Sequence, residues 1–415
     1  MEGPKRFARS TTLWLAVAAS ILAWGGALPA QTTPTLSGPS SVPAQIDADQ
    51  SVPAPAELAA EPWYEQLQRG REALERDHGL SLGADYNALY QRASRSPGDD
   101  DAAGNVFRLY GNWTLVNRGA NDRGSLVFKA EYRGRLGTSI APQALGPTVG
   151  YAGLTSVPFS DAGGVLTNLY WTRAFANNRM AIIAGVVDVT DYLDVYALVN
   201  PWTDFNNLSF STNPTIPAPN QGLGAAFRWS FTPNYYAVAG LADANGDPHD
   251  PGDFFKSFFD VQEYFYHAEV GWVESWDKRY SDNVHVAVWG QDPRDAAGVD
   301  RGKGITFSAS RSLNERWIPF FRAGYSDGGG AIVDRAISTG VGYKLSGRED
   351  FVGFGASWAR APGRDEDQYA FEAYYRWQPV KHLQIAPDIQ YIVNPANSPS
   401  TSSLWVVGVR LRAAF

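Results

Sequence analysis

Apolar and polar residues alternate along much of the chain with a period of two. In the final segment, residues 404–415, every second residue counted back from Phe415 is apolar, and the residues between them include Arg412 and Arg410. Successive side chains of a β-strand point to opposite faces, so this period indicates strands whose two faces meet different surroundings. The pattern predicts an all-β protein.

The alternation recurs in sixteen segments, each long enough to cross a bilayer as a strand of about ten residues. Their connections are alternately short and long, and the longest covers residues 189–222. Short turns on one side and long loops on the other are typical of transmembrane β-barrels, and rings at strand ends suit the membrane interface. We therefore predict an antiparallel transmembrane β-barrel of about 16 strands over residues 80–415. The predicted strands start near residues 80, 107, 125, 165, 181, 223, 235, 264, 283, 304, 317, 337, 351, 368, 383 and 403.

The sequence before the barrel divides into three parts. Residues 1–30 carry basic residues, then an apolar run over 13–24, then small residues, which is the order of a secretory signal peptide. Residues 31–62 are rich in proline and predict a disordered linker. Apolar residues at helical spacing over 63–79 predict a short periplasmic helix.

Composition and motifs exclude several classes of function. The net charge of -8 argues against a nucleic-acid partner, and the absence of cysteine excludes disulfides and thiol chemistry. The five histidines lack metal-site spacing, and no serine lies in a G-x-S-x-G motif. We expect neither enzymatic activity nor a cofactor or metal. A barrel-hosted hydrolase and a secreted sugar-binding β-sandwich remain as alternatives.

Residues 169–198 (LYWTRAFANN…), 206–247, 373–395 and 404–415 (LWVVGVRLRAAF) resemble the carbohydrate-selective, OprB-like porin family. The resemblance implies an outer-membrane porin through which small hydrophilic solutes, with sugars favoured, diffuse passively along a water-filled barrel. A general, non-specific porin is the alternative. It also implies contact with outer-membrane lipid, recognition of the Phe415 strand by the barrel assembly machinery, and a monomer or homotrimer.

The longest connection is expected to fold into the lumen and narrow it. Guanidinium and carboxylate groups on inward strand positions would face this loop and hydrogen-bond sugar hydroxyls, and aromatic rings would meet the apolar face of the sugar. The residues predicted to line the pore or bind substrate are Arg108, Tyr110, Arg133, Tyr170, Asp188, Asp191, Trp202, Arg228, Glu372, Arg376 and Arg410.

Overall fold

The computed structural model describes residues 36–51, 62–345 and 349–415. They belong to one compact unit that comprises residues 31–415. The predicted signal peptide, residues 1–30, lies outside the described residues.

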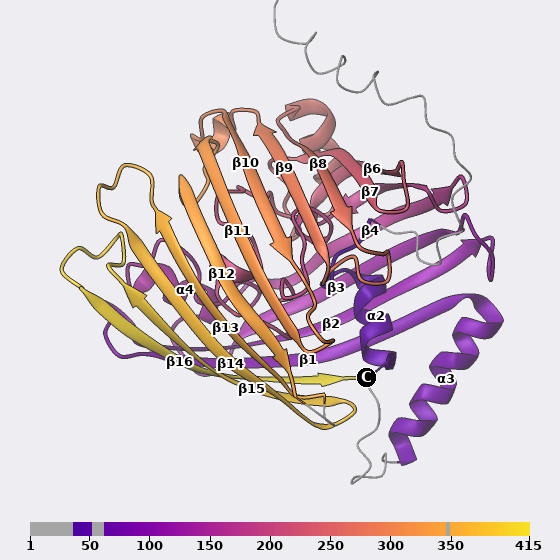
Figure 1. Cartoon of the computed structure of the whole chain (residues 1–415), viewed down its shortest axis with the longest axis horizontal. Coiled ribbons are helices and arrows are strands. Elements are labelled where there is room, and N and C mark those ends of the chain that lie inside the picture. Colours follow the sequence, from indigo (N-terminus) through magenta and orange to yellow (C-terminus); the bar gives the residue numbers. More distant parts are fainter. Residues whose placement is uncertain (1–35, 52–61, 346–348) are drawn as a thin grey trace, which may run out of the picture. The chain divides into compact units, whose positions relative to one another are not determined.

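Sixteen strands form a closed antiparallel barrel, in which each strand pairs with its neighbours in the sequence and β1 pairs with β16 (Figure 1). The predicted fold and strand number are thereby confirmed. The strands are β1 Leu80–Ala93, β2 Asp101–Val116, β3 Gly124–Arg135, β4 Gly163–Phe175, β5 Met180–Val187, β6 Gly222–Ser230, β7 Tyr235–Asp243, β8 Tyr264–Val273, β9 Asn283–Gln291, β10 Gly302–Ser310, β11 Trp317–Gly328, β12 Arg335–Lys344, β13 Phe351–Arg360, β14 Gln368–Val380, β15 Leu383–Val393 and β16 Ser403–Ala414.

The outer face of the barrel is apolar. On β16, Val407 and Val409 are 48% and 45% exposed, whereas Arg410, between Val409 and the next outward residue, is buried. Aromatic pairs lie near both ends of the outer face. The rings of Trp317 and Tyr343 are 4.3 Å apart near the short turns, and those of Tyr391 and Trp405 are 4.3 Å apart near the long loops. This arrangement is that of a lipid-facing band flanked by aromatic girdles.

β2 begins at Asp101, ahead of the predicted start near residue 107, because its first residues continue the ladder with β1. Ala102 and Val106 point inward there and are fully buried. Ala102 packs in one cluster with Leu145, and Val106 packs in another with Phe159. Inward positions on this stretch are therefore apolar because a loop covers them.

Two helices precede the barrel. α3 (Pro62–His78) occupies the segment for which the spacing predicts a helix. α2 (Val42–Ser51) lies within the predicted disordered linker, so that prediction is wrong for residues 36–51. The prolines do not prevent this helix because Pro43 stands in its first turn, where a missing N–H is tolerated. Burial of its apolar residues, including Ile46, stabilises it.

The remaining helical segments are short and lie in connections between strands. Within the described residues, no helix is long and apolar enough to span a membrane. The short segments are α4 Pro142–Thr148, η2 Val189–Asp191, α5 Leu208–Ser211, α6 Phe254–Lys256, η3 Ser257–Val261 and η4 Asp295–Ala297.

If the exposed face of β16 contacts lipid, Val409→Arg should lower the free energy of unfolding by roughly 2 to 4 kcal/mol, because a cation near the bilayer midplane is costly. The matched control is Ala413→Arg on the same face near the strand end, for which the expected cost is about 0 to 1 kcal/mol. Reversible urea unfolding in lipid vesicles measures both values. Equal costs for the two variants would contradict the assigned membrane depth.

Candidate functional site

The connection from β5 to β6, residues 188–221, folds into the barrel and is held there by side chains of the opposite wall. Arg410 donates to the carbonyl oxygens of Pro201 and Asp204, both at 2.8 Å. Glu372 accepts hydrogen bonds from the backbone N–H groups of Asn206 (2.7 Å) and Asn207 (2.9 Å). The wall thus supplies the hydrogen-bond partners that buried loop backbone requires.

Ion pairs fix the same loop at two points, one near its start and one near its middle. Near its start, Asp194 pairs with Arg322 and accepts a hydrogen bond from His285 at 3.0 Å. Burial alone would raise the pKa of the Asp194 carboxyl, but Arg322 and His285 hold it below its ordinary value. Further along, Asp204 pairs with Arg376 at 3.1 Å. Asp194 and Asp204 are therefore each neutralised by an arginine on a strand.

Aromatic rings fill the space between the loop and this wall. Phe205 of the loop packs on Phe210 of the same loop and on the strand residues Phe320 and Tyr374, with ring centroids 4.9 to 5.9 Å apart. The cluster leaves no solvent-exposed ring face on Phe205, which is fully buried. The part of the 188–221 loop around Phe205 and Phe210 is thus packed against the wall that includes β11 and β14.

A second inward loop, residues 136–162, is a feature that the sequence reasoning missed. The carbonyl oxygen of Thr155 accepts hydrogen bonds from Gln91 (3.0 Å) and Gln390 (2.8 Å) on the wall. The backbone N–H of Leu208 donates to the carbonyl oxygen of Leu154 at 3.0 Å, which joins the two loops. The 136–162 connection is the second-longest between predicted strands up to β8. Its length was the signal in the sequence that this loop could also fold into the lumen.

A cavity of about 370 Å³ lies between these loops and β3. Lys129, Glu131 and Arg133 project into it from β3. The two loops contribute a mainly apolar surface rich in proline, together with two carboxylates. The other lining residues include Ser40, Gln143, Leu154, Val157, Pro158, Asp188, Thr190, Asp191, Val199, Pro201, Trp202, Pro214, Ile216, Pro217, Pro219, Asn220, Gln221, Arg294 and Ile332.

The charged groups in the cavity are arranged in contact with one another. Glu131 accepts from Arg133 Nε at 2.7 Å and lies 3.9 Å from Lys129 Nζ, which in turn lies 3.8 Å from Asp191. Asp188 accepts from Gln221 at 2.6 Å. The cavity therefore presents both signs of charge within a short span.

Asp191 has an unusual electrostatic environment among these groups. Burial raises its pKa to about 6. Lys129 opposes the increase and Asp188 adds to it, while Asn168 and Ser40 donate hydrogen bonds to the carboxylate, both at 3.2 Å. This carboxyl therefore titrates near neutral pH, where most aspartates are fully ionised.

Of the eleven residues predicted from the sequence, the structure brings four to this cavity: Arg133, Asp188, Asp191 and Trp202. Three others, Glu372, Arg376 and Arg410, hold the 188–221 loop on the opposite wall. Arg108 pairs with Asp85, and its guanidinium carbon lies 3.9 Å from the Trp202 ring centroid. Tyr110 donates to Asp49, Tyr170 packs in an apolar cluster, and Arg228 donates to the Asn178 carbonyl oxygen in a short turn.

Lys129, Glu131 and Arg294 also line the cavity but were not among the predicted site residues. Lys129 and Glu131 are on the inward face that the alternation of β3 defines, so the period of two was the signal for them. No group of three metal-ligating side chains occurs in the part of the chain that the structure describes.

The family model of the carbohydrate-selective porin, OprB family, matches residues 128–297 and 278–415. The high-pH structure of Pseudomonas putida OprB is similar, with a TM-score of 0.68 and 13% identity over 88% of this chain and 99% of that one. A mutant of Rh. blastica porin has a TM-score of 0.51 and 14% identity over 81% of this chain and 100% of that one. At these identities the structural likeness concerns the fold. No curated protein matches the chain at a significant level.

The family match covers more than half of the chain, and the closed sixteen-stranded barrel agrees with it. The chain therefore belongs to the carbohydrate-selective porin, OprB family, and is an outer-membrane porin for carbohydrates.

Proposed function

We propose that sugars cross this porin through the cavity between β3 and the two inward loops, and that Lys129, Glu131 and Arg133 form the polar side of the path. The observation that carries the proposal is the cavity itself, in which charged groups of both signs face a wall of proline and other apolar side chains. Its volume of about 370 Å³ is within the range of small-molecule sites, about 300 to 1,000 Å³.

The two sides of the cavity suit the two sides of a sugar. Carboxylate oxygens accept hydrogen bonds from hydroxyl groups, and guanidinium and ammonium groups donate to them. The apolar C–H face of a sugar ring can pack on Ile216, Pro217 and the Trp202 edge. No group in this arrangement needs to react with the solute, so the chemistry is that of reversible binding during passive diffusion.

Glu131 lies between the two basic groups on the polar side of the cavity. Because it is paired with Arg133 and lies near Lys129, the charges offset one another before a solute arrives. A neutral sugar then meets donors and acceptors that are already oriented, and no unpaired charge has to be desolvated. A passage of this kind favours neutral polar solutes over ions.

Arg133→Ala should raise the sugar concentration that halves the single-channel current by about tenfold, because a hydrogen bond to a charged group contributes roughly 1.5 to 3 kcal/mol. Planar-bilayer recordings with added glucose measure this concentration. Arg135→Ala is the matched control, since Arg135 is exposed beyond the cavity, where it pairs with Asp161. Equal effects of the two substitutions would place the sugar path elsewhere. A wild-type current that no sugar reduces would favour a general porin.

The pKa of Asp191 predicts a pH-dependent ion preference. Lowering the pH from 7 to 5 crosses its value of about 6 and removes one negative charge from the cavity. The preference of the channel for cations over anions should therefore fall. In a KCl gradient, the reversal potential should move toward the equilibrium potential of chloride. Asp191→Asn should remove most of this shift, whereas a shift of unchanged size in that variant would assign the titration to another group.

Delivery of the protein to the outer membrane is proposed to use both ends of the chain. The signal peptide would be removed on export, so N-terminal sequencing of the mature protein should begin at Gln31, after cleavage at Ala30, or at Leu28, after cleavage at Ala27. Phe415 closes the barrel by exchanging backbone hydrogen bonds with Ala84 at 2.7 and 3.1 Å. Its half-buried ring at the strand end suits recognition by the assembly machinery. The native mass in detergent distinguishes the monomer from the homotrimer.

Phe415→Ala should reduce the amount of heat-modifiable barrel in the outer membrane several-fold, while the purified variant should still refold in detergent. Immunoblots of membrane fractions measure the first quantity and gel mobility the second. If the variant accumulated at the wild-type level, assembly would not depend on this ring.

A further inference from the structure

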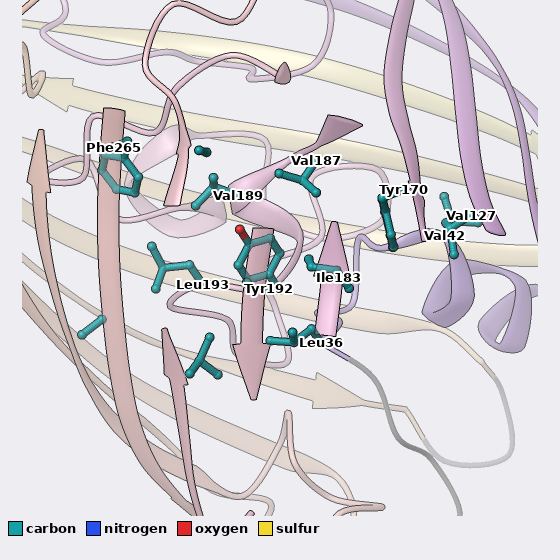
Figure 2. Packing of buried hydrophobic residues seen from close by; sticks show 14 of the residues in the cluster. Leu36, Val42, Val127, Tyr170, Ile183, Val187, Val189, Tyr192, Leu193 and Phe265 are labelled. Atoms are coloured by element: carbon teal, nitrogen blue, oxygen red, sulfur yellow. The ribbon is translucent and has the colours of Figure 1, made fainter. Parts of the chain in front are cut away.

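The segment 36–51, which includes α2, lies inside the barrel and packs against inward side chains. Leu36, Val42 and Ile46 are buried, with exposed fractions of 4%, 1% and 3%. They form one cluster with Val127 and Ile183 of the wall, and Figure 2 shows Leu36 and Val42 among these side chains. The N-terminal segment therefore occupies part of the lumen.

The wall is apolar where this segment lies. Val127 on β3 pairs with Tyr170 on β4, and both point inward, as does Ile183 on β5. Inward positions of a water-filled barrel are ordinarily polar. An apolar patch on three neighbouring strands would be costly in water, and the apolar face of α2 covers it. The wall is thus complementary to the segment.

Ionic contacts hold the end of α2. Asp49 accepts two hydrogen bonds from the guanidinium of Arg412, each 2.8 Å long, and a third from Tyr110 at 2.9 Å. Arg412 also donates to Asp85 at 2.8 Å. The side chains of Arg412 and Asp49 are 3% and 11% exposed. Because the pair is nearly buried, loss of the Asp49 charge would leave Arg412 with fewer partners in a poorly solvated place.

The start of the segment contacts the 188–221 loop and the cavity. Ser40 donates to Asp191 at 3.2 Å and lines the cavity, and Asn200 donates to the Pro39 carbonyl oxygen at 3.2 Å. The backbone N–H of Gly38 donates to the Asp191 carbonyl oxygen. The segment thus forms one boundary of the proposed path.

This boundary is at the end of the barrel that carries the short turns and the chain ends. Arg412 lies near the end of β16, three residues before Phe415. Tyr280 lies in the short connection between β8 and β9 and donates to the Ser37 carbonyl oxygen at 2.7 Å. In outer-membrane barrels the short turns are on the periplasmic side.

We infer that residues 36–51 are a plug that closes the periplasmic end of the passage, and that solutes leave the barrel only when this plug is displaced from its seat. This inference rests on the proposed path for the position of the cavity, but displacement of the plug is a separate event with its own measurement. The Asp49 and Arg412 pair is the latch, because it is the ionic contact between α2 and the wall.

Single-channel recording of the full chain in planar bilayers tests the plug. Asp49→Asn should raise the fraction of time in the fully open state by about tenfold or more, because the latch loses its charge. Asp47→Asn is the matched control, since Asp47 is on the same helix and exposed. It should behave like the wild type. Heat-modifiable gel mobility shows that each variant has a folded barrel.

Thiol labelling tests the movement independently of current. The chain has no cysteine, so Ile46→Cys introduces a single thiol at a buried position of α2. A charged maleimide should label it slowly, and adding Asp49→Asn should increase the labelling rate by about tenfold, in step with the open fraction.

The proposal is overturned if Asp49→Asn matches Asp47→Asn in both open fraction and labelling rate, since the segment would then be a fixed part of the wall. It is also overturned if the wild type is open all the time. If Asp49→Asn opens the channel and labels faster, but sugars never reduce the current, the plug stands and the proposed sugar path fails.

Discussion

The structure depends on one constraint, which is that the backbone polar groups of a lipid-exposed chain must all be hydrogen-bonded within the protein. The pairing of β1 with β16 meets this requirement because it leaves no open sheet edge. Closure in turn divides every strand into an outward face that suits lipid and an inward face that does not. The interior then has to be occupied by water, by loops or by other parts of the chain. In this barrel two loops and the N-terminal segment occupy part of it.

Inside the barrel, the strands act as a scaffold of side-chain donors and acceptors for irregular backbone. Arg410 and Glu372 bind the backbone of the 188–221 loop, and Gln91 and Gln390 bind that of the 136–162 loop. Many inward charged residues that resemble pore-lining groups are thus structural anchors. The charges that remain beside open space are concentrated on β3 and at the start of the 188–221 loop, which places the candidate path on one side of the lumen.

The inner wall also changes character along the barrel axis. Toward the short turns it carries an apolar patch and a buried ionic cluster, and both are satisfied by the N-terminal segment. Toward the long loops it carries the polar groups that bind loop backbone. The proposed sugar path, the 188–221 loop and the N-terminal segment meet at Asp191, which contacts Lys129, Asn168 and Ser40. A single carboxyl thereby connects three separate parts of the chain.

The sequence by itself determined the barrel, because a strand that separates lipid from a polar interior must alternate with a period of two, as residues 404–415 do. It also located the inward face of the strands, on which Arg133 lies, whereas Asp191 belongs to the 188–221 loop and was expected in the lumen because that connection is the longest. It did not distinguish an arginine that lines the cavity, such as Arg133, from an anchor such as Arg410, because both alternate in the same way. Only the tertiary structure decided which inward residues meet loops and which meet open space. It alone showed that residues 36–51 are ordered, since that helix is stabilised by contacts with Val127 and Arg412, which are distant in sequence.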